Sequence, residues 1–317
     1  MNKIILKQTN KVARFDQNAA AVYLTSLNSE VGRVSMRQAL NVCAGLMSSN
    51  ADAVTFDWSQ VRFQHVAAIR TRLNEKYKPA SVNKMLAAVR GALKAAWQLG
   101  QMSAEDYHKA VSVKGVKNDT LPAGRELTQG EITALMADCE HDTTNAGARD
   151  AAIIGLMYSC GLRREEVVTL DLADFDNESG RLVVRGKGNK ERIAWLTGGA
   201  ARALADWLTV RGEDPGALFV AVNKSGRITS LKNMTPKTIY SMLAKRANEA
   251  GVKSFSPHDM RRTFVSDLLD AGADITTVSK MAGHANVTTT SRYDRRPEEA
   301  KRKAASLLHV PYMGRGA

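Results

Sequence analysis

The spacing of apolar residues predicts that the chain consists mostly of helices. Between residues 16 and 110, apolar positions recur every three or four residues, which is the period of an amphipathic helix. We expect one helix to begin at a capping box formed by Ser35 and Gln38. The expected helices in this part of the chain are 17–28, 35–48, 59–77 and 82–99.

The segment 82–99, VNKMLAAVRGALKAAWQL, has the clearest pattern of the four. Its apolar residues at 82, 85, 86, 89, 93, 96 and 97 fall on one face of a helix. Arg90 and Lys94 lie four residues apart on the other side, and Lys84 precedes them. We therefore expect a small domain of four or five helices whose last long helix presents basic residues to a partner.

The second half of the chain adds strands to the helical pattern. Thr128 and Glu131 form a capping box, and Gly161 is a natural end for a helix over 147–160. β-branched residues flank a glycine-rich turn in 181–196, which predicts a β-hairpin, and ALFVAV at 217–222 predicts a short strand. Further helices are expected at 199–211, 235–250, 257–271, 274–282 and 298–308.

These patterns predict two domains, in line with a length of 317 residues. The fold class is mainly α, with a helical domain followed by a mixed α/β domain that contains a small hairpin or sheet. Residues 111–125 contain Gly, Pro and basic residues without a sustained period, which is typical of a linker. The expected organisation is an N-terminal arm at 1–15, a helical domain at 16–110, the linker at 111–125 and a second domain at 126–317.

The charge is distributed unevenly between the two predicted domains. The formal net charge is +13, and residues 1–125 contain 18 Lys and Arg against 8 Asp and Glu. Residues 126–317 contain 27 against 24. A basic first domain indicates a polyanion partner such as nucleic acid, or serves solubility alone. Aromatic residues make up only 6% of the chain, which favours duplex phosphates over a stacking surface for single strands.

The same composition argues against a membrane protein and a disulfide-stabilised one. There is no run of about 18 apolar residues, and MNKIILKQTN lacks the features of a signal peptide. Cys43, Cys139 and Cys160 fit no zinc or disulfide spacing, so we expect reduced core thiols. The expected location is the cytoplasm, in association with DNA, without a metal or cofactor.

Five short polar stretches stand out against the packing pattern. CGLRREEV places Arg163 just after Gly161, and RGKGNKER raises Lys187 at the tip of the hairpin. In SPHDMRRTF, His258 and Arg261 are three apart on the first turn of a helix, where anions are attracted. Taken singly, these residues are compatible with a surface Arg, a solvated Lys and a capping-turn His.

The remaining two stretches lie near the C-terminus. AGHANVTTTSRY contains His284, three threonines that can fix a turn or a short helix, and Tyr293. Because the charged DRRPEEAKRK follows, we expect Tyr293 at a surface or cleft rather than in a core. In the tail, KRKAASLLHVPYMGRGA, an apolar stripe either packs on its own domain or contacts a neighbouring subunit.

The order of these motifs resembles the catalytic signature of the tyrosine recombinase (phage integrase) family. The order is an Arg, a Lys on a hairpin, H-x-x-R, then G-H with a Tyr nine residues after that His. TQGEITALM looks like the start of the family's catalytic domain, and SKMAGHANVTTTSRYDRR matches its tyrosine box. SVNKMLAAVRGALKAAWQLGQMS resembles the last long helix of its core-binding domain. Met281 and Ala282 depart from the more common pair of Leu residues, which affects packing only.

The resemblance implies a role for each residue. Tyr293 would be the nucleophile, Arg163 and Arg261 would bind the scissile phosphate, and Lys187 would protonate the leaving 5′-oxygen. His258 and His284 would hydrogen-bond the phosphate or move the tyrosine proton. Glu166 would orient Arg163 or His258, and Arg262 would contact the DNA backbone or a carboxylate.

The resemblance also implies a partner and an assembly. The partner would be double-stranded DNA with a specific site, held between the two domains. The assembly would be a homotetramer with two protomers per site, which acts through a 3′-phosphotyrosyl intermediate and a Holliday junction. The motifs are equally compatible with integration, excision, dimer resolution and transposition.

Three alternatives predict different features. A type IB topoisomerase shares this chemistry but acts as a monomer. A helical DNA-binding regulator without catalysis predicts that at least one catalytic group is missing, whereas all six positions are present. A metal-dependent nuclease predicts clustered carboxylates near the basic motifs, and the sequence does not show them.

Overall fold

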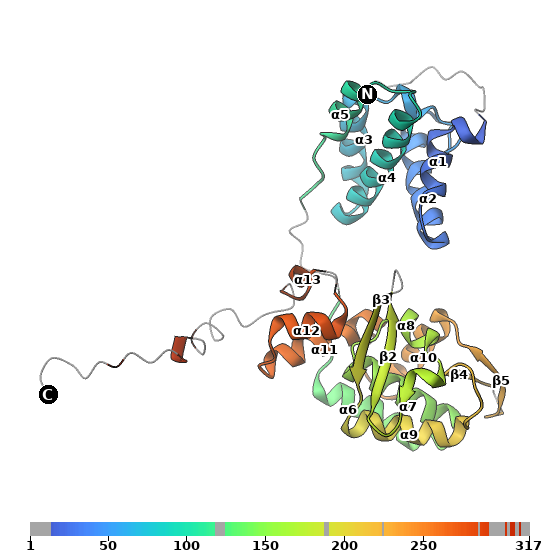
Figure 1. The fold of residues 1–317 in the computed structure, drawn as a ribbon, viewed down its shortest axis with the longest axis vertical. Coiled ribbons are helices and arrows are strands. Elements are labelled where there is room, and N and C mark those ends of the chain that lie inside the picture. Colours follow the sequence, from blue (N-terminus) through green and yellow to red (C-terminus); the bar gives the residue numbers. More distant parts are fainter. Residues whose placement is uncertain are drawn as a thin grey trace, which may run out of the picture. The chain divides into compact units, whose positions relative to one another are not determined.

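The computed structural model of the chain divides into two compact units, Met1–Leu121 and Pro122–Ala317 (Figure 1). It is mainly helical with small sheets, as predicted. The residues that the structure describes are 14–117, 124–186, 190–223, 225–284, 286–291, 302, 305–307 and 311. The predicted arm therefore lies outside them except for its last two residues, and so do seven of the eleven residues of the helix predicted at 298–308.

The first unit is built around one long helix, α4, which packs against all four of its neighbours (Figure 1). Its buried face includes Leu86 and Leu93, both with no exposed surface. Burial of this apolar face drives the four surrounding helices onto α4. The helices are α1 (Ala19–Thr25), α2 (Glu30–Met47), α3 (Phe63–Lys76), α4 (Pro79–Gln98) and α5 (Ala104–Val111), with 3-10 turns at Phe15–Gln17 and Trp58–Gln60.

Two predictions within this unit were wrong in detail. Helix α2 begins at Glu30, because the Ser29 side chain accepts a hydrogen bond from the backbone N–H of Gly32 and caps the helix there. Ser35 therefore lies inside the helix and is not its cap. Trp97 was expected on the buried face of α4 but is 36% exposed and stacks flat on Tyr107, with ring centroids 5.0 Å apart.

The segment predicted as a linker is ordered at both ends. Asn83 exchanges two hydrogen bonds of 2.8 Å with the backbone of Val116, which fixes that end to α4. At the other end, the backbone N–H of Arg125 donates to Asp259, and its guanidinium pairs with Glu131 at 2.8 Å. Of the residues between these attachments, 118–123 lie outside the described part of the chain.

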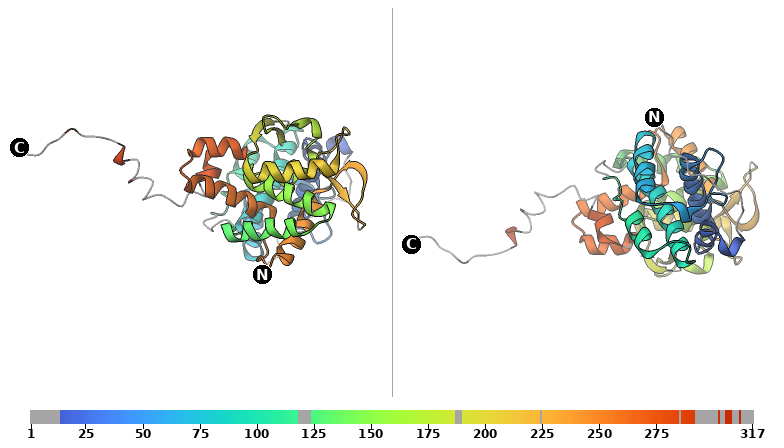
Figure 2. Two further views of the ribbon diagram at one scale, coloured as in Figure 1. Left: turned by 90° about the horizontal axis from the view of Figure 1, so that it is seen from below. Right: turned by 90° about the horizontal axis from the view of Figure 1, so that it is seen from above.

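The second unit surrounds the buried helix α7, which packs against α6, α8, α9 and α11 (Figure 2). Ile153 and Leu156 in α7 have no exposed surface, and Gly155 lets the backbone of α9 approach closely at Ala200. The helices are α6 (Gln129–His141), α7 (Asn145–Ser159), α8 (Arg164–Thr169), α9 (Gly198–Arg211), α10 (Pro236–Glu249), α11 (Pro257–Asp270), α12 (Ile275–Ala282) and α13 (Val287–Ser291), with a 3-10 turn at Leu172–Asp174.

Two small antiparallel sheets complete this unit. The predicted hairpin is confirmed as part of a sheet ordered β1-β2-β3, in which Leu182 and Val184 of β2 point into the core. The predicted strand at 217–222 is shorter, and it pairs with a strand that the pattern did not predict. The strands are β1 (Phe175–Asp176), β2 (Arg181–Gly186), β3 (Lys190–Trp195), β4 (Val220–Val222) and β5 (Ile228–Asn233).

A buried ion cluster links α10 to α6 and α7. The guanidinium of Arg246, on a residue 2% exposed, lies 2.9 Å from Asp150, 2.6 Å from Asp142 and 3.2 Å from Asp138. Burial opposes ionisation of Asp142, but hydrogen bonds from Thr144 and Arg246 outweigh it and lower its pKa to about 2. The cluster fixes the position of α10, whose Tyr240 lines the candidate active site.

The three cysteines are buried free thiols, as predicted. Within the residues that the structure describes, no helix has the length and apolar character needed to cross a membrane. The same residues contain no group of three or more His, Cys, Asp or Glu side chains placed to hold a metal ion.

Candidate active site

The position of Arg163 is set by the turn that follows α7. Gly161 has φ +58°, and a side chain there would collide with the ring of Phe264, so the sharp turn requires glycine. Arg163 then caps α8, and its backbone N–H donates to Glu166 at 2.9 Å. Its guanidinium donates to Glu166 at 2.7 Å and to the carbonyl oxygen of Gly283 at 3.1 Å.

Helix α11 supplies His258 and Arg261 from its first turns. Ser256 and Asp259 form the capping box, and Pro257 occupies the first helical position, which has no N–H to satisfy. Arg261 is 3% exposed and donates to the carbonyl oxygens of Gly161 and Ala282. It therefore joins the turn before α8 to the end of α12.

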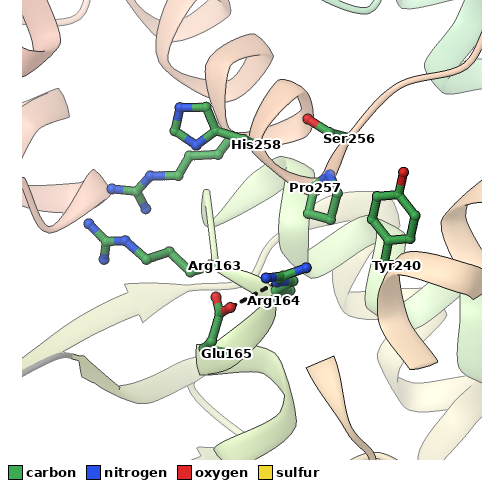
Figure 3. A pocket seen from close by; sticks show the side chains of 8 residues that line it. Arg163, Arg164, Glu165, Tyr240, Ser256, Pro257 and His258 are labelled. Atoms are coloured by element: carbon green, nitrogen blue, oxygen red, sulfur yellow. Dashed lines mark hydrogen bonds and ion pairs between the residues drawn. The ribbon is translucent and has the colours of Figure 1, made fainter. Parts of the chain in front are cut away.

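These side chains line a cavity of about 300 Å³. Arg163 and His258 lie on one side of it and Tyr240 of α10 on the opposite side (Figure 3). Guanidinium groups bind phosphate oxygens through paired hydrogen bonds and keep their charge at all working pH values. The cavity is lined by Arg163, Arg164, Glu165, Tyr240, Ser256, Pro257, His258 and Arg261.

His284 reaches this site from the end of α12. Gly283 adopts the left-handed conformation, with φ +62°, and His284 N donates back to the Ser279 carbonyl at 3.0 Å. Nδ1 of His284 shares a hydrogen bond of 2.8 Å with Oγ1 of Thr290, which is fully buried in α13. One of the three threonines thus holds the imidazole, and the expected short helix is present.

Burial and the nearby arginines lower the pKa of both imidazoles. Burial lowers the pKa of His258, and the charges of Arg261, Arg262 and Arg163 lower it further. Burial and the charges of Arg261 and Arg163 lower the pKa of His284 to about 4. A bound anion would offset these charges, so the site favours an anion over additional protons.

Glu166 is a buried carboxylate, 3% exposed, held between two guanidiniums. Burial alone would raise its pKa, but hydrogen bonds from Arg192 and from the backbone of Arg163 lower it. Arg192 makes a two-point contact with it, at 2.9 and 2.8 Å. Of the two roles predicted for Glu166, the structure places it against Arg163.

The sequence analysis did not identify Arg192, because the apolar Ile193 and Trp195 of β3 favour the opposite face of the strand as the buried one. In a half-buried strand, alternate residues face opposite sides. The flanking residues of β3, Glu191 and Ile193, are exposed, so Arg192 faces the interior. An inward-facing Arg needs hydrogen-bond acceptors, and the carboxylate of Glu166 supplies two of them.

Five of the predicted site residues come together in this structure: Arg163, Glu166, His258, Arg261 and His284. Lys187 and Tyr293 lie outside the described residues. Their neighbours in sequence are at the site, since Gly186 approaches Glu166 and α13 holds His284. Their roles therefore stay predictions.

The predicted DNA-contacting residues fall into two groups. Lys84 and Lys94 are exposed on α4, as a contact to DNA requires. Arg90 is half-buried and donates to the carbonyl oxygen of Val113 at 2.6 Å. Arg262 is 4% exposed and donates to the carbonyl oxygen of Gly124, which supports the packing before α6, and its role in DNA binding stays a prediction.

Guanidiniums and an imidazole around a cavity of about 300 Å³ are groups that can bind a phosphate. Residues 125–299 match the sequence profile of the phage integrase family. The chain belongs to this family, the tyrosine recombinases, which are enzymes that cleave and rejoin DNA by phosphoryl transfer.

Curated relatives support the same assignment. Tyrosine recombinase XerC of Pelobacter propionicus is 30% identical over 259 residues, which is 81% of each chain. XerC of Corynebacterium efficiens is 34% identical over 217 residues, 68% of this chain and 66% of that one. These relatives favour site-specific recombination over the topoisomerase, regulator and nuclease alternatives.

Solved structures share the fold. A structure of the Tn1549 transposon integrase in complex with transposon right end DNA has a TM-score of 0.65 at 18% identity, and covers 92% of this chain and 100% of its own. XerH recombinase bound to palindromic difH substrate also has a TM-score of 0.65, at 19% identity, and covers 96% of this chain and 99% of its own.

Proposed function

We propose that this chain is a site-specific recombinase that cleaves double-stranded DNA through Tyr293. The observation that carries the proposal is the convergence of Arg163, Arg261, His258 and His284, from three separate elements, on one site. Tyr293 lies two residues beyond α13, whose Thr290 holds His284. The relatives bound to recombination-site DNA support the same partner here.

In the proposed reaction, Oη of Tyr293 attacks the scissile phosphorus and the P–O5′ bond breaks. A free tyrosine has a pKa near 10, so its hydroxyl is a weak nucleophile until cations surround the phosphate. Arg163 and Arg261 bind the non-bridging oxygens and stabilise the charge of the transition state. His284 hydrogen-bonds a non-bridging oxygen, and neutral His258 accepts the tyrosine proton.

The leaving 5′-oxygen takes a proton from Lys187, because an alkoxide is a poor leaving group. The products are a 3′-phosphotyrosyl ester and a free 5′-hydroxyl. The ester retains the free energy of the broken bond, so attack by a 5′-hydroxyl rejoins DNA without ATP. We propose four protomers, two per site, that exchange strands in two steps through a Holliday junction.

The test begins with the DNA that copurifies with a Tyr293→Phe variant. Sequencing this DNA identifies the site, from which a nicked duplex substrate can be made. We expect wild-type protein to form a covalent adduct whose modified peptide contains Tyr293, and the variant to bind equally well without an adduct. An adduct at the wild-type level in Tyr293→Phe would disprove the assignment of the nucleophile.

A further inference from the structure

Arg192 connects three elements of the second unit through a single side chain. Its side chain is 12% exposed and extends from β3 to Glu166 at the start of α8. Its Nε donates to the carbonyl oxygen of Met281 in α12 at 3.0 Å. All five N–H donors of a guanidinium lie in one plane, so these contacts fix the plane as well as the position.

Arg192 also packs against the turn that carries His284. A side chain added at Gly283 would lie 3.2–3.4 Å from three atoms of Arg192. The carbonyl oxygen of Gly283 meanwhile accepts a hydrogen bond from Arg163. The turn at Gly283 therefore contacts both Arg163, which is predicted to bind the phosphate, and Arg192.

The shared carboxylate gives these contacts a chemical consequence. Oε1 of Glu166 accepts from both Arg163 and Arg192, and Oε2 accepts from Arg192 and the backbone of Arg163. Without Arg192, the negative charge of this buried carboxylate would be balanced by the Arg163 guanidinium alone. Arg163 would then be pulled towards Glu166 and away from an incoming phosphate.

We propose that Arg192 is a positioning residue that couples the β2–β3 hairpin to Arg163 and to the segment that leads through His284 towards Tyr293. The hairpin contributes Lys187, which lies between β2 and β3 in the sequence. Arg192 thereby connects the hairpin that carries the predicted general acid to Arg163, which is predicted to bind the phosphate, and to the segment that carries the predicted nucleophile. This inference rests on the proposed function, since it explains how that chemistry is aligned.

The same sheet provides a matched control, Arg185 on β2. Arg185 pairs with Asp174, a carboxylate that is 5% exposed, so it also neutralises a buried acid. Its other partner is the exposed Glu191, and neither partner belongs to the candidate active site. Loss of Arg185 therefore reports on the general effect of removing a buried ion pair from this sheet.

The experiment measures the rate of covalent adduct formation on the nicked substrate with enzyme in excess. We expect Arg192→Ala to react about 100-fold more slowly, as small displacements of catalytic groups do, with DNA affinity unchanged. Arg192→Lys keeps the charge but loses the two-point contact, so its rate should lie between those of the wild type and Arg192→Ala. Methylguanidinium should restore the rate of Arg192→Ala and leave Arg185→Ala, which reacts normally, unaffected.

A second readout does not require catalysis. The charge of Arg192 helps to keep the pKa of His284 low, so NMR titration of Arg192→Ala should show that pKa raised, and Arg185→Ala should not change it. If Arg192→Ala does not fold, Arg192→Lys decides the kinetic question. Wild-type rates in the folded Arg192 variants, or equal losses in Arg185→Ala, would overturn the inference. An inactive wild-type protein with the expected His284 shift would instead refute the proposed function.

Discussion

Arg163 donates a hydrogen bond from Nη2 to the carbonyl oxygen of Gly283, 3.1 Å away and 120 residues further along the chain. The contact fixes the start of α8 to the turn that precedes His284. Arg163, which is predicted to bind the phosphate, and the segment that leads to Tyr293 are therefore held together by a direct contact. Such preorganisation lowers the reorganisation needed when the transition state forms.

The low pKa of His284 predicts that the protein loses stability in mild acid. The pKa is about 4 in the folded chain and near 6.5 when unfolded, so the unfolded state binds more protons between these values. The free energy of unfolding is therefore highest above about pH 6.5 and decreases as the pH falls towards 4. After allowance for solvent screening, we expect His284 to account for about 1–2 kcal/mol of this change.

Urea unfolding at several pH values between 7 and 4 measures this effect. A His284→Asn variant keeps a polar group beside Thr290 but does not titrate, so its free energy of unfolding should fall less steeply with pH. Identical pH profiles for the two proteins would show that His284 is not responsible. Saturating the protein with duplex DNA should raise the pKa of His284, because a bound phosphate offsets the positive charges of the neighbouring arginines.

Gly161 is predicted to be irreplaceable, for reasons of conformation and space together. A Cβ at this position would lie 2.3 Å from the ring of Phe264, and φ is +58°. Gly161→Ala should therefore cost about 2–4 kcal/mol of stability and displace Arg163. Gly251→Ala is the matched control, since φ is +65° but nothing lies within 4 Å, and it should cost only about 1 kcal/mol. Equal costs in thermal unfolding would rule out the steric explanation.

The sequence predicted those parts of the site that depend on local rules. Ser256 and Pro257 start α11, which places His258 and Arg261 on its first turns. The long-range contacts could not be predicted in this way. The hydrogen bonds from Arg261 to Gly161 and Ala282 depend on how helices pack, which no local spacing encodes.

Helix boundaries illustrate the same distinction. Ser35 and Gln38 have the spacing of a capping box, but Ser29 caps the helix first, and a helix continues once it has started. Trp97 has the right spacing for the core of the first unit, but α4 ends there and the ring stacks on Tyr107 instead. Spacing predicts a face, and tertiary contacts decide how far along the helix that face is buried.

Arg246 should be among the most sensitive positions for stability. Replacing it by Met would leave Asp138, Asp142 and Asp150 as neighbouring acids without their shared cation. Removal of one member of a buried ion cluster typically costs about 3–5 kcal/mol. Urea unfolding should show this loss for Arg246→Met and almost none for Arg202→Met, an exposed position on α9. A loss below 1 kcal/mol for Arg246→Met would contradict this role.

The exposed lysines of α4 predict a measurable contribution to DNA binding. If Lys84 and Lys94 each neutralise one phosphate, each Ala variant should lower the slope of log K against log salt by about 0.9. Lys109→Ala is the control, because this exposed lysine is already paired with Glu105. Fluorescence anisotropy with one duplex across a salt series gives the slopes. Unchanged slopes for both α4 variants would place the DNA on another face of this unit.

Lys187 makes the sharpest chemical prediction, because a general acid is needed only when the leaving group is poor. Lys187→Ala should cleave a normal duplex about 10²–10⁴-fold more slowly than the wild type, because general acid catalysis usually contributes a factor of this size. A substrate in which sulfur replaces the 5′-oxygen of the cleaved bond has a good leaving group and should restore the rate of this variant. Arg163→Ala, which loses a phosphate ligand, should not be rescued by sulfur. Rescue of both variants or of neither would assign the leaving-group proton to another donor.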